Sequence, residues 1–208
     1  MILYVDGCSH SFGEKEDGII PYSDLVDSDD FTKVINNSAQ GKANDSIFSD
    51  VIDNLSSQKN KKKFSYVVQF SSANRRTHML PNGERIWINP YDNTKYHLKL
   101  EPMASMDTLH YIYALQNIFE NHRVNYCMLS YFPIEKTIKN ARFIKKNIDL
   151  SKFITYDDST HPLFDGFIDY MKRDNLTKDI EGHPSQKGHY FLFERIKNYF
   201  KDYNLYLI

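Results

Sequence analysis

A serine near one end of the chain and a histidine near the other are the residues whose types could do chemistry together. Ser9 lies in the segment GCSH at residues 7–10, directly after an apolar run at residues 2–5, and His183 lies in the segment EGHP at residues 181–184. A serine hydroxyl is a weak nucleophile until a base removes its proton, and histidine has a pKa suited to that step. The pair predicts attack on an ester or amide carbonyl, provided that folding brings the two side chains together.

Two other polar segments are expected at the same edge of the fold. The segments NSAQGKAN at residues 37–44 and QFSSANRR at residues 69–76 each follow a run that is typical of a strand. Ligands bind at the carboxyl ends of the strands in open α/β sheets. These two segments, the Ser9 turn and the loop that carries His183 are therefore expected to form one site.

The elements that must position this site alternate along the chain. Strands are predicted at residues 2–5, 32–35, 64–70, 124–129 and 153–155, and helices at residues 21–26, 43–55, 107–122, 134–147, 163–171 and 185–201. Such alternation favours a parallel sheet covered by helices on both faces. We expect a single α/β domain over residues 1–208.

An irregular insertion is predicted at about residues 75–106. It contains the turn signals PNG at residues 81–83 and NPYD at residues 89–92, and short pieces at residues 85–88 and 96–100 could pair as a hairpin. One interpretation is a substrate lid whose aromatic side chains stack on sugar rings. The alternative is that the insertion covers apolar surface or contacts another protein chain. The residues at issue are Arg75, Arg76, His78, Arg85, Trp87, Tyr91 and Tyr96.

The order of these segments resembles the SGNH (GDSL-like) hydrolase family. In that family a serine follows strand one, a glycine strand two and an asparagine strand three, and a histidine precedes the last helix; Ser9, Gly41, Asn74 and His183 stand in that order here. The resemblance implies that Ser9 is the nucleophile and His183 the base. It implies an oxyanion hole formed by the backbone N–H groups of Ser9 and Gly41 and the side chain of Asn74. It also implies an α/β/α sandwich with a flavodoxin-like parallel sheet of about five strands.

The acidic partner of the histidine is open between two residues. The family usually places an aspartate three residues before the histidine, where this chain has Ile180. Asp179 and Glu181 flank that position, and relatives with the acid two residues before the histidine would select Glu181. A backbone carbonyl in this role is a third alternative. The chain also has Cys8 where the family has aspartate before the serine, and Ser72 where it favours glycine two residues before the asparagine.

Each of these residues also has an ordinary structural interpretation. Ser9 could cap a short helix, and His183 could be a loop residue at a helix start marked by Pro184. Gly41 could serve only a turn, and Asn74 could cap the chain after its strand. His10 and His189 are interpreted as neighbours of the site and not as catalysts, with His189 packing in the first turn of the last helix.

Composition excludes several other functions. The 208 residues include 26 Lys and Arg against 27 Asp and Glu, so the net charge of -1 gives no electrostatic case for nucleic acid or an anionic membrane. No apolar stretch approaches the roughly 20 residues that span a bilayer, and the first residues lack the pattern of a signal peptide. The two cysteines, Cys8 and Cys127, suggest neither a disulfide framework nor a zinc site.

The sequence thus predicts a serine esterase or O-deacetylase that needs no cofactor or metal. Its expected partner is a small acyl ester or an acylated carbohydrate, and it is expected to be cytoplasmic as synthesised. The alternative is a catalytically degenerate fold of the same type that serves as a structural or interaction protein of a phage particle, with protein partners in a larger assembly. A virion protein would lack a signal peptide as well.

Overall fold

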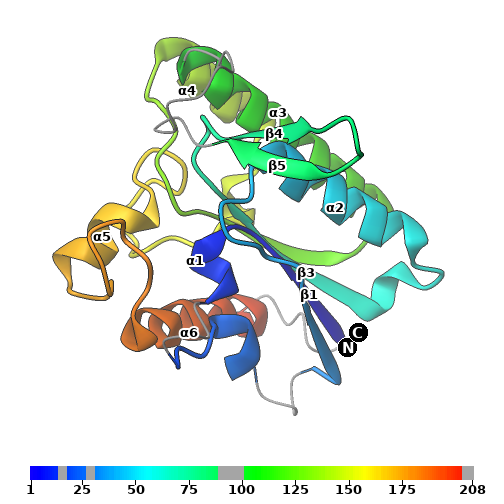
Figure 1. Ribbon diagram of the computed structural model, residues 1–208, viewed down its shortest axis with the longest axis horizontal. Coiled ribbons are helices and arrows are strands. Elements are labelled where there is room, and N and C mark those ends of the chain that lie inside the picture. Colours follow the sequence, from blue (N-terminus) through cyan, green and yellow to red (C-terminus); the bar gives the residue numbers. More distant parts are fainter. Residues whose placement is uncertain (14–17, 27–30, 89–100, 203–208) are drawn as a thin grey trace.

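The central sheet is parallel, as the alternating pattern predicts. The computed structural model describes residues 1–13, 18–26, 31–88 and 101–202 (Figure 1). Four strands, β1 (Ile2–Asp6), β2 (Lys33–Asn36), β3 (Phe64–Phe70) and β6 (Asn125–Ser130), pair in the order β2-β1-β3-β6, and every pair is parallel. The predicted fifth strand is reduced to one parallel bridge between Met128 and Phe153. With that bridge the order is that of a flavodoxin-like sheet.

Alternate residues of the strands enter two separate cores, because helices cover both faces of the sheet. Tyr66 and Val68 of β3 pack with α2 (Asn44–Ser57), α3 (Glu101–His122) and α4 (Ile138–Asn147). Val67 packs on the opposite face with α5 (Phe167–Arg173) and α6 (Gln186–Asp202). All seven residues of β3 are buried, including the polar Ser65 and Gln69, because helices cover both faces of the sheet. Figure 1 shows α2 and α3 on one side of the strands and α6 on the other.

The remaining elements are short. The helix α1 (Ser9–Phe12) follows β1, the 3-10 helix η2 (Tyr22–Leu25) precedes β2, η3 (Lys61–Lys63) precedes β3, and η4 (Leu150–Lys152) follows α4. An antiparallel hairpin is formed by β4 (Arg76–Met79) and β5 (Arg85–Ile88). Within the described ranges, no helix is both long enough and apolar enough to cross a membrane.

Three predicted boundaries were wrong. Helix α3 begins at Glu101, so Asp107 is inside it and does not cap it. Helix α4 begins at Ile138, because Thr137 caps it by accepting a hydrogen bond from the Asn140 N–H. The predicted start at residue 134 lies in the preceding loop. Helix α5 begins at Phe167 and not at residue 163.

The late start of α5 has a local cause at Gly166. This residue caps α5 where the chain passes the backbone of residues 132 and 133, and a Cβ added there would lie 2.5 Å from the Phe132 carbonyl carbon and from the Pro133 nitrogen. Only glycine permits that approach. The helix therefore begins after this contact.

The insertion also differs from its predicted pairing. Residues 85–88 do form a strand, but their partner is β4, at residues 76–79. The proposed partner at residues 96–100, together with Tyr91 and Tyr96, lies outside the described residues. The turn signal PNG at residues 81–83 closes the observed hairpin.

Candidate active site

The turn after β1 presents Ser9 at the carboxyl edge of the sheet. Ser9 is the first residue of α1 and is buried, with Cys8 as the preceding cap residue. Gly7 is tightly packed, because a Cβ at this position would lie 2.4 Å from the Ser11 Oγ and 3.0 Å from the Gln69 Cβ. The chain leaves the strand and turns into a helix within three residues, which aims the serine at the sheet edge.

A second tight loop presents His183 just before α6. Gly182 has a φ of +91°, and a Cβ there would lie 2.7 Å from a side-chain carbon of Ile168. The Tyr131 hydroxyl donates a 2.6 Å hydrogen bond to the Gly182 carbonyl, and the Lys178 N–H donates to the His183 carbonyl at 2.8 Å. These contacts fix the loop that carries the imidazole.

Folding brings the serine and the histidine together across 174 positions of sequence. His183 Nε2 lies 3.1 Å from the Ser9 Oγ, and His183 Nδ1 lies 2.7 Å from Asp179 Oδ2. The carboxylate can only accept, so we assign the imidazole proton to Nδ1, which leaves the Nε2 lone pair facing the serine hydroxyl. The three side chains form one continuous line of hydrogen bonds, and this arrangement can generate a serine nucleophile.

Of the two acids that the sequence left open, Asp179 makes the close contact. Its Oδ1 accepts hydrogen bonds from the backbone N–H groups of Gly182 and His183, at 2.8 and 3.0 Å. Glu181 Oε2 is 3.9 Å from His183 Nδ1, and the Glu181 side chain is 77% exposed. Burial by itself would raise the pKa of Asp179, but the hydrogen bonds from His183 and Gly182 outweigh it and hold the pKa below its usual value. Asp179 is therefore a carboxylate at neutral pH.

Gly41 lies on the loop after β2 in a conformation that suits glycine. Its φ is +75°, and no atom lies within 4 Å of the position that a Cβ would occupy. The loop is held to the Ser9 turn, because the Ala39 N–H donates to the Gly7 carbonyl at 3.1 Å. Gly41 thus lies on a loop that is directly attached to the nucleophile turn.

Asn74 lies on the turn that follows β3, where the Arg75 N–H donates to the Ser72 carbonyl. This turn is joined to the start of α2 by Asn44, whose Oδ1 accepts from the Ser71 N–H at 2.7 Å and whose Nδ2 donates to the Ser71 carbonyl at 3.1 Å. Asn44 belongs to the second polar segment, but nothing in the sequence marked it as the link between the second and third segments.

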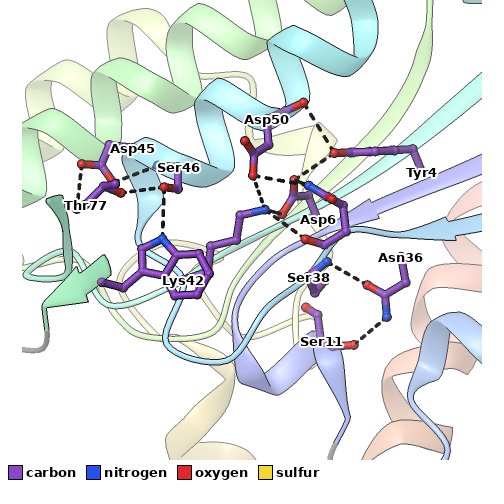
Figure 2. Close-up of polar contacts among 12 residues, drawn as sticks. Tyr4, Asp6, Ser11, Asn36, Ser38, Lys42, Asp45, Ser46, Asp50 and Thr77 are labelled. Carbon is purple, nitrogen blue, oxygen red and sulfur yellow. Dashed lines mark hydrogen bonds and ion pairs between the residues drawn. The ribbon is translucent and has the colours of Figure 1, made fainter. Parts of the chain in front are cut away.

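A buried lysine next to Gly41 is the feature that sequence reasoning missed. Lys42 is 1% exposed, and its Nζ lies 2.5 Å from Asp6 Oδ1 and 2.7 Å from Asp50 Oδ2. It also donates to the Asn37 carbonyl at 3.0 Å, which closes the loop on itself. Figure 2 shows Lys42 reaching toward Asp6 at the end of β1 and Asp50 on α2. The one feature of the sequence that could have drawn attention to Lys42 is its long charged side chain in a segment of otherwise uncharged and mostly small residues.

Asp6 is the buried centre of this network. It accepts hydrogen bonds from the Tyr4 hydroxyl and from Asn37 Nδ2, each 3.1 Å long, in addition to its ion pair. Burial raises the pKa of Asp6 to about 6, although Lys42 and Asn37 act in the opposite direction. The network joins β1, the Gly41 loop and α2, and so holds the loop that carries Gly41 beside β1.

The hairpin of the insertion is attached to α2. Arg85 forms a 2.8 Å ion pair with Asp50, the Trp87 indole N–H donates to the Ser46 Oγ at 3.1 Å, and the Thr77 N–H donates to Asp45 at 3.1 Å. The contacts of Asp45, Ser46 and Thr77 are drawn in Figure 2. The polar edge of Trp87 is thus used inside the protein, and a role of the insertion as a lid stays a prediction.

His189 lies one turn into α6 and is buried, as the sequence suggested. Its Nδ1 accepts a hydrogen bond from the Tyr22 N–H at 3.3 Å. Burial, and to a smaller extent the charge of Lys178, lowers its pKa from 6.5 to about 4. Between these pH values the unfolded chain binds a proton that the folded chain excludes, so this residue reduces stability as the pH falls from 6.5 to 4.

We expect His189→Asn to make the protein less sensitive to acid. Asn can place its Oδ1 where Nδ1 accepts from Tyr22, but it cannot be protonated. Urea unfolding at pH 7 and pH 5 should show that the free energy of unfolding falls by about 2 kcal/mol less in the variant than in the wild type. An equal loss in both proteins would contradict the assignment of a neutral buried ring.

Among the residues that the structure describes, no group of three His, Cys, Asp or Glu side chains is arranged to hold a metal ion. Both cysteines are buried and free of disulfides.

Comparison with known proteins gives a match at the level of the fold. No protein-family model matches the sequence, and no curated protein matches it either. Among solved structures, the chain is similar to the psychrotrophic esterase EstA from Pseudoalteromonas sp., in a structure inhibited by monoethylphosphonate. The superposition has a TM-score of 0.51 and 12% sequence identity, and it covers 97% of each chain. The likeness is one of fold alone, an α/β fold with a parallel central sheet flanked by helices.

Proposed function

We propose that this chain is a serine hydrolase of the SGNH type that cleaves small acyl esters. The observation that carries the proposal is the line of hydrogen bonds from Asp179 through His183 to Ser9, with lengths of 2.7 and 3.1 Å. The similarity in fold to an esterase supports it. Asp179 is the proposed acid, in preference to the exposed and more distant Glu181.

In the proposed reaction His183 Nε2 removes the Ser9 proton while the Oγ attacks the carbonyl carbon of the ester. The negative charge moves to the carbonyl oxygen, for which the backbone N–H groups of Ser9 and Gly41 and the Asn74 side chain are the proposed donors. Collapse of the tetrahedral intermediate breaks the bond to the alcohol, which leaves with the proton from His183. His183 then deprotonates a water molecule that attacks the acyl-enzyme. It returns this proton to the Ser9 Oγ as the acyl–oxygen bond breaks and the carboxylic acid leaves.

The proposed substrate class is a carbohydrate that carries an O-acetyl or other acyl group. This part of the proposal is based on the resemblance to the SGNH family. Release of acetate from acetylated sugars, compared with turnover of p-nitrophenyl acetate, would test this part. A preference for the artificial ester over every acetylated carbohydrate would argue against it.

Labelling with a fluorophosphonate probe tests the nucleophile. Attack by the Ser9 Oγ would form a phosphorus–oxygen bond and displace fluoride, and mass spectrometry should locate the adduct on Ser9. Ser9→Ala should not be labelled. Ser11→Ala, which removes another buried hydroxyl two residues away, should be labelled like the wild type.

A folded wild-type protein that gives no adduct and hydrolyses no ester would contradict the proposal. That result would favour the alternative of a degenerate site in a structural protein.

A further inference from the structure

A second histidine, His10, is buried against the proposed pair and has no role in the reaction as written. It follows Ser9 in α1 and is 1% exposed. Its ring is stacked on that of His183, with centroids 4.8 Å apart and planes 15° apart. The Tyr131 ring lies 4.0 Å from it, and the Phe132 ring meets it edge-on at 5.2 Å. Neighbouring rings thus fix the plane of His10.

The hydrogen bonds of His10 are all on one side of the ring. Its Nδ1 lies 3.2 Å from the Cys8 Sγ and 3.5 Å from the Ser9 Oγ. Its Nε2 is buried and has no hydrogen-bond partner among the described residues. A buried N–H without a partner is rarer and more costly than a lone pair without one, so the proton belongs on Nδ1.

This tautomer decides which way the serine hydroxyl points. With the proton on Nδ1, His10 faces two acceptors, the Cys8 Sγ at 3.2 Å and the Ser9 Oγ at 3.5 Å. Donation to the Ser9 Oγ directs the serine proton to His183 Nε2. With the opposite tautomer, Nδ1 would accept the serine proton and compete with the base. The 3.5 Å separation is long, but hydrogen bonds of a resting catalytic site commonly shorten as the reaction proceeds.

His10 is also suited to its place because it stays neutral. Burial lowers the pKa of His10 well below 6.5, and the charges of Arg75 and Lys172, and of His183 and His189 when they are protonated, act in the same direction. A neutral ring does not repel the imidazolium that forms on His183 during the reaction. A charged group at the same position would oppose that proton transfer.

We propose that His10 is a positioning residue that directs the Ser9 hydroxyl toward His183 by donating from Nδ1. The stack with His183 and Tyr131 holds the donor in place. This inference rests on the proposed function and adds a fourth side chain to the working site.

Two substitutions of His10 distinguish the effect of its Nδ1–H donor from the effect of its aromatic ring. Asn places an amide N–H near the position of Nδ1, whereas Phe keeps the ring and removes the donor. We expect His10→Phe to lower kcat for p-nitrophenyl acetate about tenfold with little change in KM, the effect of one neutral hydrogen bond. His10→Asn should keep more activity than His10→Phe. Equal or lower activity in His10→Asn, or an unchanged kcat in His10→Phe, would overturn the inference.

Nitrogen-15 NMR of the wild type provides a readout that does not depend on turnover. The His10 ring should remain neutral between pH 5 and pH 8, with its proton on Nδ1, and a proton on Nε2 or a charged ring would overturn the inference even if a variant fails to fold. An inactive, unlabelled wild type would contradict the proposed function itself. An active wild type with His10→Phe at full rate would contradict only the role of His10.

Discussion

Asp179→Asn should lower kcat for ester hydrolysis by about 10⁴-fold, the loss seen when the acid of such a triad loses its charge. The carboxylate accepts the Nδ1 proton of His183 at 2.7 Å. An amide could instead donate to Nδ1, which would put the imidazole proton on the nitrogen that faces Ser9. It would also leave the imidazolium without a counter-charge. The measurement is kcat and KM for p-nitrophenyl acetate at pH 7.

The fold of the Asp179 variant should be preserved. The Asn Oδ1 can still accept the hydrogen bonds from the Gly182 and His183 N–H groups that shape the loop. An unchanged thermal midpoint, together with a large loss of kcat, would therefore indicate a chemical role.

Glu181→Gln is the matched control, because it makes the same change two residues away. The Glu181 carboxylate is 3.9 Å from Nδ1 and mostly exposed, so a change in kcat of no more than about twofold is expected for a screened surface charge. A larger loss in Glu181→Gln than in Asp179→Asn would transfer the role of the acid to Glu181. Full activity in both variants would favour the backbone carbonyl that the sequence also left open.

Lys42→Met should reduce the free energy of unfolding by about 3–5 kcal/mol. The lysine is the positive partner of the fully buried Asp6 and also pairs with Asp50. Its removal leaves a carboxylate in the interior without a counter-charge. Urea unfolding at pH 7 measures the loss.

Two comparisons isolate the buried pair. Lys62→Met, in the exposed basic segment before β3, should change stability by less than about 0.5 kcal/mol. Adding Asp6→Asn to Lys42→Met should recover part of the loss, since the uncompensated charge is then removed. A loss in Lys42→Met as small as that of the surface control would show that the pair is solvated.

Lys42 also supports the loop of the candidate active site. Lys42 follows Gly41 and bonds back to the Asn37 carbonyl, so its side chain closes the loop that carries one proposed oxyanion donor. The buried network is thus a support for the site as well as for the fold.

The sequence by itself determined the parts of this protein that depend on local patterns. The run at residues 64–70 predicted β3 at its observed limits, since seven aromatic, β-branched and polar residues between turn signals leave few other structures. The alternation of elements predicted the parallel α/β sheet, which the structure confirms. The resemblance gave the order of Ser9, Gly41, Asn74 and His183, and their roles stay predictions.

Only the tertiary structure decided what depends on contacts between distant segments. The sequence leaves both Asp179 and Glu181 open as the acidic partner of His183. The turn at Gly182 brings Asp179 to the imidazole. The sequence does not indicate that Lys42 is buried. In the structure it forms ion pairs with Asp6 of β1 and Asp50 of α2. The sequence predicted the wrong partner for β5, and it did not indicate the stack of His10 on His183. Local propensity acts over a few residues, whereas a side chain's charge partners and burial are set by whatever the whole fold places beside it.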